Sequence, residues 1–220
     1  MNEVFFNCSP PKLGDFLSTA MRAMPGDQAA FFTAGSKPEG LVRDQLALHV
    51  HENTDLIAAR EWLHRIDLAV LSEQEPLVLI ELKAWAHLNA LSEKKLMNSD
   101  PKHGIAGAFL SDAEKLRKIS LDFLKKTQKQ PKLFAVNVFF AVGVLDQNVP
   151  NEGVVKYARE HRKALQEVGS LVLLCDTGLG KAKSFFETHG ETSVHALSAG
   201  VTWGIDVRLD ALVIEIEASK

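Results

Sequence analysis

Apolar positions recur at helical spacing near the start of this chain of 220 residues. Two windows, 15–24 and 39–53, each carry an apolar stripe with polar residues on the opposite side, which predicts two amphipathic helices. The intervening pair, Phe31 and Phe32, is expected to lie in the core. The N-terminal quarter is therefore predicted to be helical.

Three apolar runs of strand length follow at 56–63, 65–71 and 76–84, joined by connections of only a few residues. Short connections favour antiparallel neighbours, so these runs predict a meander. Side chains alternate between the two faces of a strand, which places Glu81 and Lys83 on the same face of the third run. If the second and third runs pair, Asp67 can lie beside Glu81.

The rest of the chain alternates helical and extended patterns. Ser111 with Glu114 three residues later has the pattern of a capping box, which predicts a helix over 111–127. A long run of β-branched and aromatic residues predicts a buried strand over 133–145. Helices are expected at 154–168 and 181–187, and strands at 170–175 and within 201–217. This order predicts an α/β fold, with helices on the faces of a mixed sheet.

Composition narrows the class of protein without identifying a partner. The net charge of −3 gives no general attraction to nucleic acid, so any such surface has to be a local patch. Two cysteines far apart in sequence, Cys8 and Cys175, favour a reduced intracellular protein. No run approaches the ~18 apolar residues of a membrane span, and the N-terminus lacks a secretory pattern. We therefore expect a cytoplasmic location and no membrane partner.

Acidic residues occur inside two of the apolar runs, Asp67 in the second and Glu81 in the third. Charges in buried strands are costly unless they are paired or bind a metal. Two neighbouring carboxylates repel at neutral pH, and a hard divalent cation such as Mg²⁺ would relieve that repulsion. Lys83 could orient an attacking water or neutralise developing negative charge. The pattern predicts metal-assisted phosphodiester chemistry.

This arrangement, Asp67 followed by Glu81-Leu82-Lys83 on the next strand, resembles the PD-(D/E)XK nuclease superfamily, which includes many restriction endonucleases. Ile66 stands where the family motif has proline, a departure that many members share. The resemblance implies a restriction-endonuclease-like mixed β-sheet flanked by helices. It also implies Asp67, Glu81 and the Leu82 carbonyl as ligands of Mg²⁺, for which Mn²⁺ can substitute, and Lys83 as the group that positions water.

Members of the superfamily often carry a further glutamate on a helix before the meander. Glu39 matches it, with Asp44 as the alternative, and the resemblance implies that Glu39 assists at the metal; an acidic residue is also simply favoured in the first turn of a helix. The resemblance covers about 39–145. We therefore expect one nuclease-like domain over 1–220, with a helical lead-in at 1–38, a catalytic core at 39–145 and a part at 146–220 that completes the sheet.

Positive charge collects after this candidate site. Lys115 and Lys118 in the predicted helix, and His87 after the third strand, are candidate substrate contacts, because lysines beside a cleavage centre suit a phosphate backbone. A solvated helix face would explain the same lysines, and a hydrogen-bonded loop residue would explain His87.

The expected function is a Mg²⁺-dependent nuclease that acts on nucleic acid, with DNA as the expected substrate. Many members of the superfamily act as dimers, so a homodimer is one expected state. The alternative is a catalytically inactive member of the same fold that serves as a nucleic-acid-binding or assembly module. A further alternative is an unrelated interaction protein in which the charges form a structural ion pair.

Overall fold

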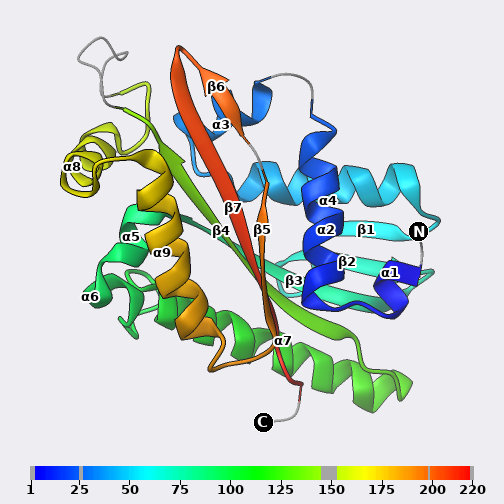
Figure 1. Ribbon diagram of the computed structural model, residues 1–220. Helices are drawn as coiled ribbons and strands as arrows, with labels where there is room; N and C mark the ends of the chain where they lie inside the picture. Colours follow the sequence, from blue (N-terminus) through cyan, green and yellow to red (C-terminus); the bar gives the residue numbers. More distant parts are fainter. Residues whose placement is uncertain (1–2, 25–26, 145–152, 198, 219–220) are drawn as a thin grey trace.

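A single mixed sheet organises the described part of the chain, which comprises residues 3–24, 27–144, 153–197 and 199–218 of a computed structural model. Its strand order is β1-β2-β3-β4-β7-β5, and β6 pairs with β7 beside this path (Figure 1). The strands are β1 (Ile57–Trp62), β2 (Ile66–Ser72), β3 (Glu75–Ala86), β4 (Lys132–Val142), β5 (Thr192–Ala196), β6 (Gly200–Thr202) and β7 (Ile205–Glu215).

Strand pairing follows the lengths of the connections. β1, β2 and β3 form the predicted antiparallel meander, which is confirmed. β3 and β4 are parallel and are separated in sequence by α7 (Ile105–Thr127), since a parallel pair needs a long crossover. β7 then returns antiparallel to β4 and pairs with β5 and β6 on its other side. The predicted α/β class with a mixed sheet is thereby confirmed.

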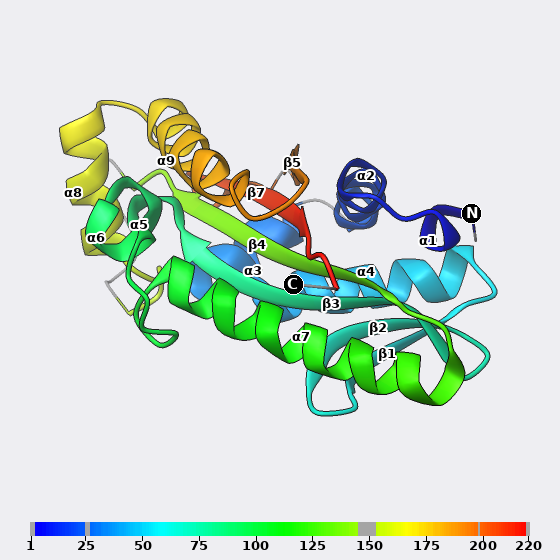
Figure 2. The ribbon, with the colours of Figure 1, turned by 90° about the horizontal axis from the view of Figure 1, so that it is seen from below.

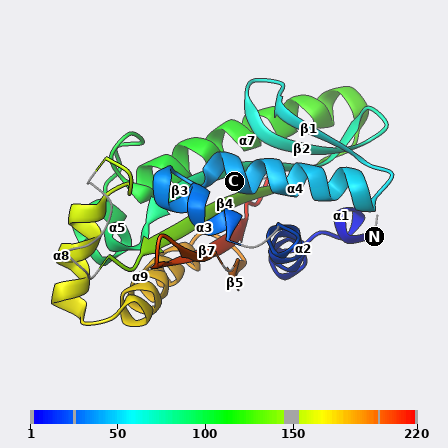
Figure 3. The same cartoon turned by 90° about the horizontal axis from the view of Figure 1, so that it is seen from above.

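Helices cover both faces of the sheet. One face carries α1 (Glu3–Phe6), α2 (Pro10–Arg22), α3 (Gln28–Gly35) and α4 (Glu39–Asn53), as seen from above in Figure 3. The opposite face carries α7 and α9 (Leu171–Phe186), and Figure 2 shows α7 lying along the strands on that side. The shorter helices α5 (His87–Leu91), α6 (Glu93–Leu96) and α8 (Ala158–Val168) gather at one end.

The two faces of β3 carry different residues, as the alternation predicts. Val78, Ile80 and Leu82 are fully buried in the core under α1–α4. Glu81 and Lys83 point to the opposite face, where both contact side chains of α7. The prediction that these two charged residues share a face is confirmed.

Two predicted boundaries in the second half are wrong. α7 begins at Ile105, not at Ser111, so the predicted capping box does not exist; Ser111 lies inside the helix. The helix extends backwards because Ile105 and Phe109 already contribute to the core. α8 begins at Ala158 instead of residue 154, and Leu145, the predicted end of the buried strand, lies outside the described residues.

The predicted strand at 170–175 is also wrong, because these residues open α9, which continues through the predicted short helix at 181–187. Ser170 caps the helix by accepting a hydrogen bond from the Leu173 backbone nitrogen at 3.1 Å. Leu174, Cys175 and Leu179 are buried at helical spacing, whereas Val172 in the same apolar run is 60% exposed. A short apolar run fits either element, and the burial pattern decides for the helix.

Phe31 and Phe32 do not lie in the core and are 48% and 47% exposed. α3 buries its small residues Ala30 and Ala34 instead, so the two rings point outward and pack against each other, with 5.4 Å between ring centroids. β5 had no counterpart in the sequence-based expectation. The end of the chain was better predicted, since β6 and β7 are the expected closing strands within 201–217.

Phe140 and Phe32 provide a matched test of this packing. Phe140 is fully buried in β4, so Phe140→Ala should lower the free energy of unfolding by about 3–5 kcal/mol. Phe32→Ala removes the same atoms from an exposed position and should cost less than about 1 kcal/mol. Urea unfolding followed by circular dichroism measures both values. An equal loss of unfolding free energy in the two variants would contradict the outward orientation of the Phe32 ring.

Candidate active site

β3 continues beyond the end of its partner β2, and this leaves part of its edge without a neighbouring strand. The paired register on this side ends at Leu68 opposite Ile80, and β2 itself begins at Ile66. β3 nevertheless runs on to Ala86, with β4 on its other side throughout. An edge of this kind presents backbone N–H and C=O groups that need other partners.

Two carboxylates provide those partners. The Leu82 backbone nitrogen donates to Asp67 Oδ2 at 2.8 Å, and the Ala84 backbone nitrogen donates to Glu39 Oε2 at 3.2 Å. Because the N–H and C=O of a strand residue point to the same side, the Leu82 carbonyl faces this edge as well. In the described part of the chain, the second oxygen of each carboxylate accepts no hydrogen bond. The edge therefore brings together Asp67, Glu39 and Leu82, three residues that the resemblance assigns to one site.

Glu81 lies next to this edge and is 3% exposed. Its Oε1 atom is 2.5 Å from Lys115 Nζ of α7, and the same ammonium donates to the Arg65 carbonyl at 2.6 Å. Burial raises the pKa of Glu81 to about 8, and the neighbouring Asp67 and Asp112 carboxylates add to the rise although Lys115 opposes it. The surroundings of Glu81 therefore disfavour its ionised form.

Lys83, two residues further along the same face, contacts Asp112 of α7, with 3.5 Å between Nζ and Oδ2. Burial by itself would lower the pKa of Lys83, but the carboxylates of Asp112, Glu39, Asp67 and Glu81 outweigh it and raise the pKa above its ordinary value. Lys83 is thus a firmly protonated cation. Burial in turn raises the pKa of Asp112.

A hard divalent cation fits this donor set. Carboxylate and carbonyl oxygens are the ligands that Mg²⁺ takes. Burial, and after it the neighbouring carboxylates, raise the pKa of Glu81, and a cation would stabilise its ionised form. In the described residues, however, Glu39, Asp67 and Glu81 do not come within 4.8 Å of one another as a group of three, and Lys115 already contacts Glu81. The residues that could bind the metal are therefore Asp67, Glu81 and Leu82, the last through its carbonyl. Lys115 would first have to leave Glu81.

The candidate substrate contacts have different outcomes. Lys115 belongs to the cluster, but as the partner of Glu81 and not as an open contact. Lys118 is exposed one turn further along α7, where it lines a cavity of about 350 Å³ together with Lys115 and His64. Asp44, the alternative to Glu39, forms ion pairs with Arg43 and Arg60 instead of bonding to the edge of β3.

The expectation that His87 contacts substrate is wrong, because the side chain is fully buried. Its Nε2 lies 3.0 Å from Asp210 Oδ2, and the Arg208 guanidinium donates to the same oxygen at 3.0 Å. The Cys175 thiol completes a group whose ligand atoms lie within 4.8 Å of one another, but burial raises the pKa of Cys175 to about 12. This buried group is neutralised by Arg208 and is closed to substrate.

Asp112 was missed by the sequence analysis. The predicted helix start at Ser111 placed it in a first turn, where an acidic residue has an ordinary role. The helical spacing nevertheless indicated its role at the site. Asp112 lies one helical turn before the buried Leu116, and Lys115 lies one turn before the buried Ile119. Residues at this spacing lie on the same side of a helix, so the two charges had to face the sheet with the apolar stripe.

A comparison of the chain with models of known protein families, with curated proteins and with solved structures found no match. The case for a function therefore depends on the site itself. In the part of the chain that the structure describes, none of the helices combines the length and apolar character needed to cross a membrane.

The pKa of Glu81 predicts how stability depends on pH. The folded chain keeps a proton on this carboxyl that the unfolded chain releases, so the contribution to stability is present below the ordinary value of 4.5 and is lost as pH rises to about 8. Glu81→Gln cannot lose a proton. The variant should therefore gain stability relative to wild type across this range and remain the more stable protein above it.

Urea unfolding of wild type and Glu81→Gln at a series of pH values measures this difference. Glu114→Gln, at an exposed position of α7, is the control and should follow the wild-type profile. Parallel profiles for wild type and Glu81→Gln would contradict the raised pKa.

Proposed function

We propose that this chain is a metal-dependent nuclease with a restriction-endonuclease-like fold, and that it hydrolyses phosphodiester bonds in DNA. One observation carries the proposal: Asp67, Glu81 and Lys83 converge at the uncovered edge of β3, with Glu39 beside them. A structural ion pair would need one acid and one base. At this edge acids outnumber lysines, which favours binding of a cation. The acids are Glu39, Asp67, Glu81 and Asp112, and the lysines are Lys83 and Lys115.

Asp67, Glu81 and the Leu82 carbonyl would hold the Mg²⁺, for which Mn²⁺ can substitute, and Glu39 would support it from the first turn of α4. When bound, the metal supplies a polarised phosphoryl oxygen, a more acidic water and charge compensation for the leaving oxygen. The chain's own contribution is to fix these oxygens on a rigid strand, which limits the reorganisation needed during reaction.

Lys83 acts as a cation and hydrogen-bond donor in this mechanism. Its raised pKa keeps the ammonium protonated at neutral pH, so it does not remove a proton from water. Instead it holds the attacking water and stabilises the negative charge that develops on the phosphoryl oxygens. Asp112 is a positioning residue, because its carboxylate fixes the direction of the Lys83 side chain.

Lys115 would change partners when the metal binds. In this structure its ammonium contacts Glu81 Oε1 at 2.5 Å. With a metal held by Asp67 and Glu81, Lys115 would be available to contact a phosphate group. Lys118 is nearby on α7, so both lysines would form the local positive patch that a chain with a net charge of −3 needs.

The same ion pair favours a second candidate. If Lys115 stays on Glu81, an ammonium group already occupies the place of a metal, and the chain would be a catalytically inactive member of the fold that binds nucleic acid or supports assembly. Removal of Lys115 discriminates between the two functions. Lys115→Ala should strengthen Mg²⁺ binding in a nuclease and create no Mg²⁺ response in the inactive alternative.

Cleavage by Lys83→Ala tests the proposed chemistry. Wild type should cleave DNA with Mg²⁺ or Mn²⁺ and fail in EDTA, and Lys83→Ala should be slower by about 10²-fold or more, because one preorganised donor to developing charge is lost. Lys163→Ala, an exposed lysine on α8, is the control with unchanged rate. Linear and circular DNA, single- and double-stranded, and RNA are assayed side by side. Cleavage of none of these by wild type would overturn the nuclease proposal.

Binding of Mg²⁺ is tested separately by thermal unfolding. A ligand that binds only the folded chain stabilises it, by about 2.7 kcal/mol when its concentration is about 100 times Kd. Wild type and Lys83→Ala should both show a rise in Tm with Mg²⁺, and Asp67→Asn should not. KCl at equal ionic strength is the control for screening. A rise of the same size in Asp67→Asn would place the metal elsewhere.

A further inference from the structure

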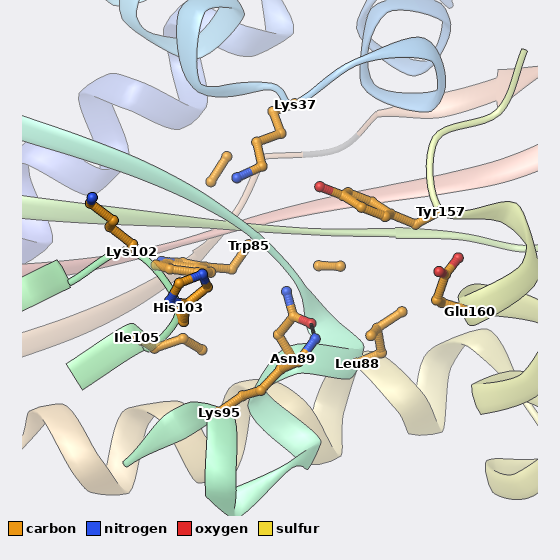
Figure 4. Close-up of a pocket in the computed structure, with 12 residues that line it drawn as sticks. Lys37, Trp85, Leu88, Asn89, Lys95, Lys102, His103, Ile105, Tyr157 and Glu160 are labelled. Carbon is orange, nitrogen blue, oxygen red and sulfur yellow. Dashed lines mark hydrogen bonds between the residues drawn. The ribbon is translucent and has the colours of Figure 1, made fainter. Parts of the chain in front are cut away.

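A second cavity lies at the end of β3, immediately after the acidic cluster. It has a volume of about 330 Å³ and includes Ala84 and Trp85 (Figure 4). Lys83 and Trp85 are two residues apart and share a face of the strand, so their Cα atoms are separated by about 6.6 Å. The cavity is therefore a direct neighbour of the proposed cleavage centre.

Trp85 is the aromatic wall of this cavity and is held in place. Its indole Nε1 donates to Asn137 Oδ1 of β4 at 3.1 Å, so the ring is anchored to the neighbouring strand. The side chain is only partly buried. Lys37 Nζ lies 5.7 Å from the ring centroid, and Figure 4 shows this lysine reaching toward the indole from the opposite wall. A fixed indole with an accessible side suits a flat, aromatic ligand.

The remaining walls are rich in positive charge. Lys37, Lys95, Lys102 and His103 line the cavity, and Glu160 is the one acid among the lining residues described. Lys95 donates to Asn89 Oδ1 at 2.9 Å, and His103 contacts the exposed Asp100 at 2.7 Å. Lys37 and Lys102 have no such carboxylate partner among the described residues. A planar ring beside two uncompensated ammonium groups matches a base and its phosphate.

We infer that this cavity holds one unpaired nucleotide of the substrate, next to the bond that is cleaved, with its base on Trp85 and its phosphate near Lys37 and Lys102. The inference rests on the proposed function and narrows its substrate. A base can stack on an indole only when it is outside the duplex. The substrate class is therefore nucleic acid with a single-stranded segment or frayed end at the cleavage position, and not continuous duplex.

Fluorescence of Trp85 tests the inference directly. The chain has three tryptophans, so Trp62→Phe/Trp203→Phe leaves Trp85 as the single reporter. Thymidine monophosphate and a short oligothymidylate are titrated in EDTA, where no cleavage occurs. We expect saturable quenching by both probes. In an otherwise unchanged chain, Trp85→Ala should bind the oligothymidylate about 10-fold more weakly or worse, and should affect blunt duplex of equal length less.

Further variants keep the test independent of folding. Trp85→Phe retains a ring and should recover part of the affinity. Lys37→Ala/Lys102→Ala should weaken binding, whereas Lys163→Ala is the matched control. Circular dichroism verifies that each variant is folded. Absence of quenching by both probes, together with unchanged affinity of Trp85→Ala, would overturn the inference and leave the Lys37–Trp85 contact as an ordinary surface interaction.

The two proposals fail in different ways. Metal-dependent cleavage without any response of Trp85 would retain the nuclease and overturn the nucleotide cavity. Quenching of Trp85 in a chain that cleaves no substrate would retain nucleotide binding in the cavity and overturn the nuclease. Equal loss of single-strand and duplex affinity in Trp85→Ala would overturn the preference for an unpaired nucleotide.

Discussion

The hydrogen-bonding requirement of one uncovered strand edge determines how the site is built. β3 runs past Ile66, the first residue of β2. The backbone N–H groups of Leu82 and Ala84 therefore need acceptors that no strand supplies. Asp67 and Glu39 supply them, and this gathers two charges at one partly buried edge. This charge has to be balanced, and Lys83 and Lys115 lie beside it for that reason. Asp112 of α7 in turn pairs with Lys83. The missing neighbour of β3 is thus the reason why so many charged side chains gather at this edge.

A comparison within the same sheet shows why this charge remains available. Asp210 of β7 is as buried as Glu81, but it accepts a hydrogen bond from Arg208 and contacts His87, so its charge is compensated. Glu81 has one lysine and several carboxylates around it. The first arrangement contributes to structure. The second is electrostatically strained, and such strain is common where groups are arranged for chemistry.

Sequence reasoning succeeded where the pattern was local and repeated. Alternation in β3 was sufficient to place Glu81 and Lys83 on one face, and the cost of burying a charge identified Glu81, whereas Asp67 proved to be only partly buried. Reasoning failed where two elements compete for the same pattern. The apolar run after Ser170 fits a strand or one helical turn, and only the packing of Leu174 and Leu179 selects the helix.

Other failures came from contacts that are distant in sequence. Phe31 and Phe32 look like core residues, but α3 packs through its alanines, which no local pattern reveals. The helix start that was placed at Ser111 concealed the role of Asp112, since a residue in a first turn is ordinarily a partner of the helix dipole. The cavity around Trp85 combines residues from four separate segments, so it could be recognised only from the folded chain.

The order of strands in the sheet differs from their order along the chain, and this affects how the protein can be made. β7 is the last strand in the described chain, yet it lies inside the sheet between β4 and β5. Until residue 215 has left the ribosome, β4 therefore has one open edge, and ten of its eleven residues are buried in the finished structure. The meander that carries the acidic edge can pair earlier. A nascent chain would thus expose an apolar strand edge during synthesis, a feature that invites aggregation and chaperone capture.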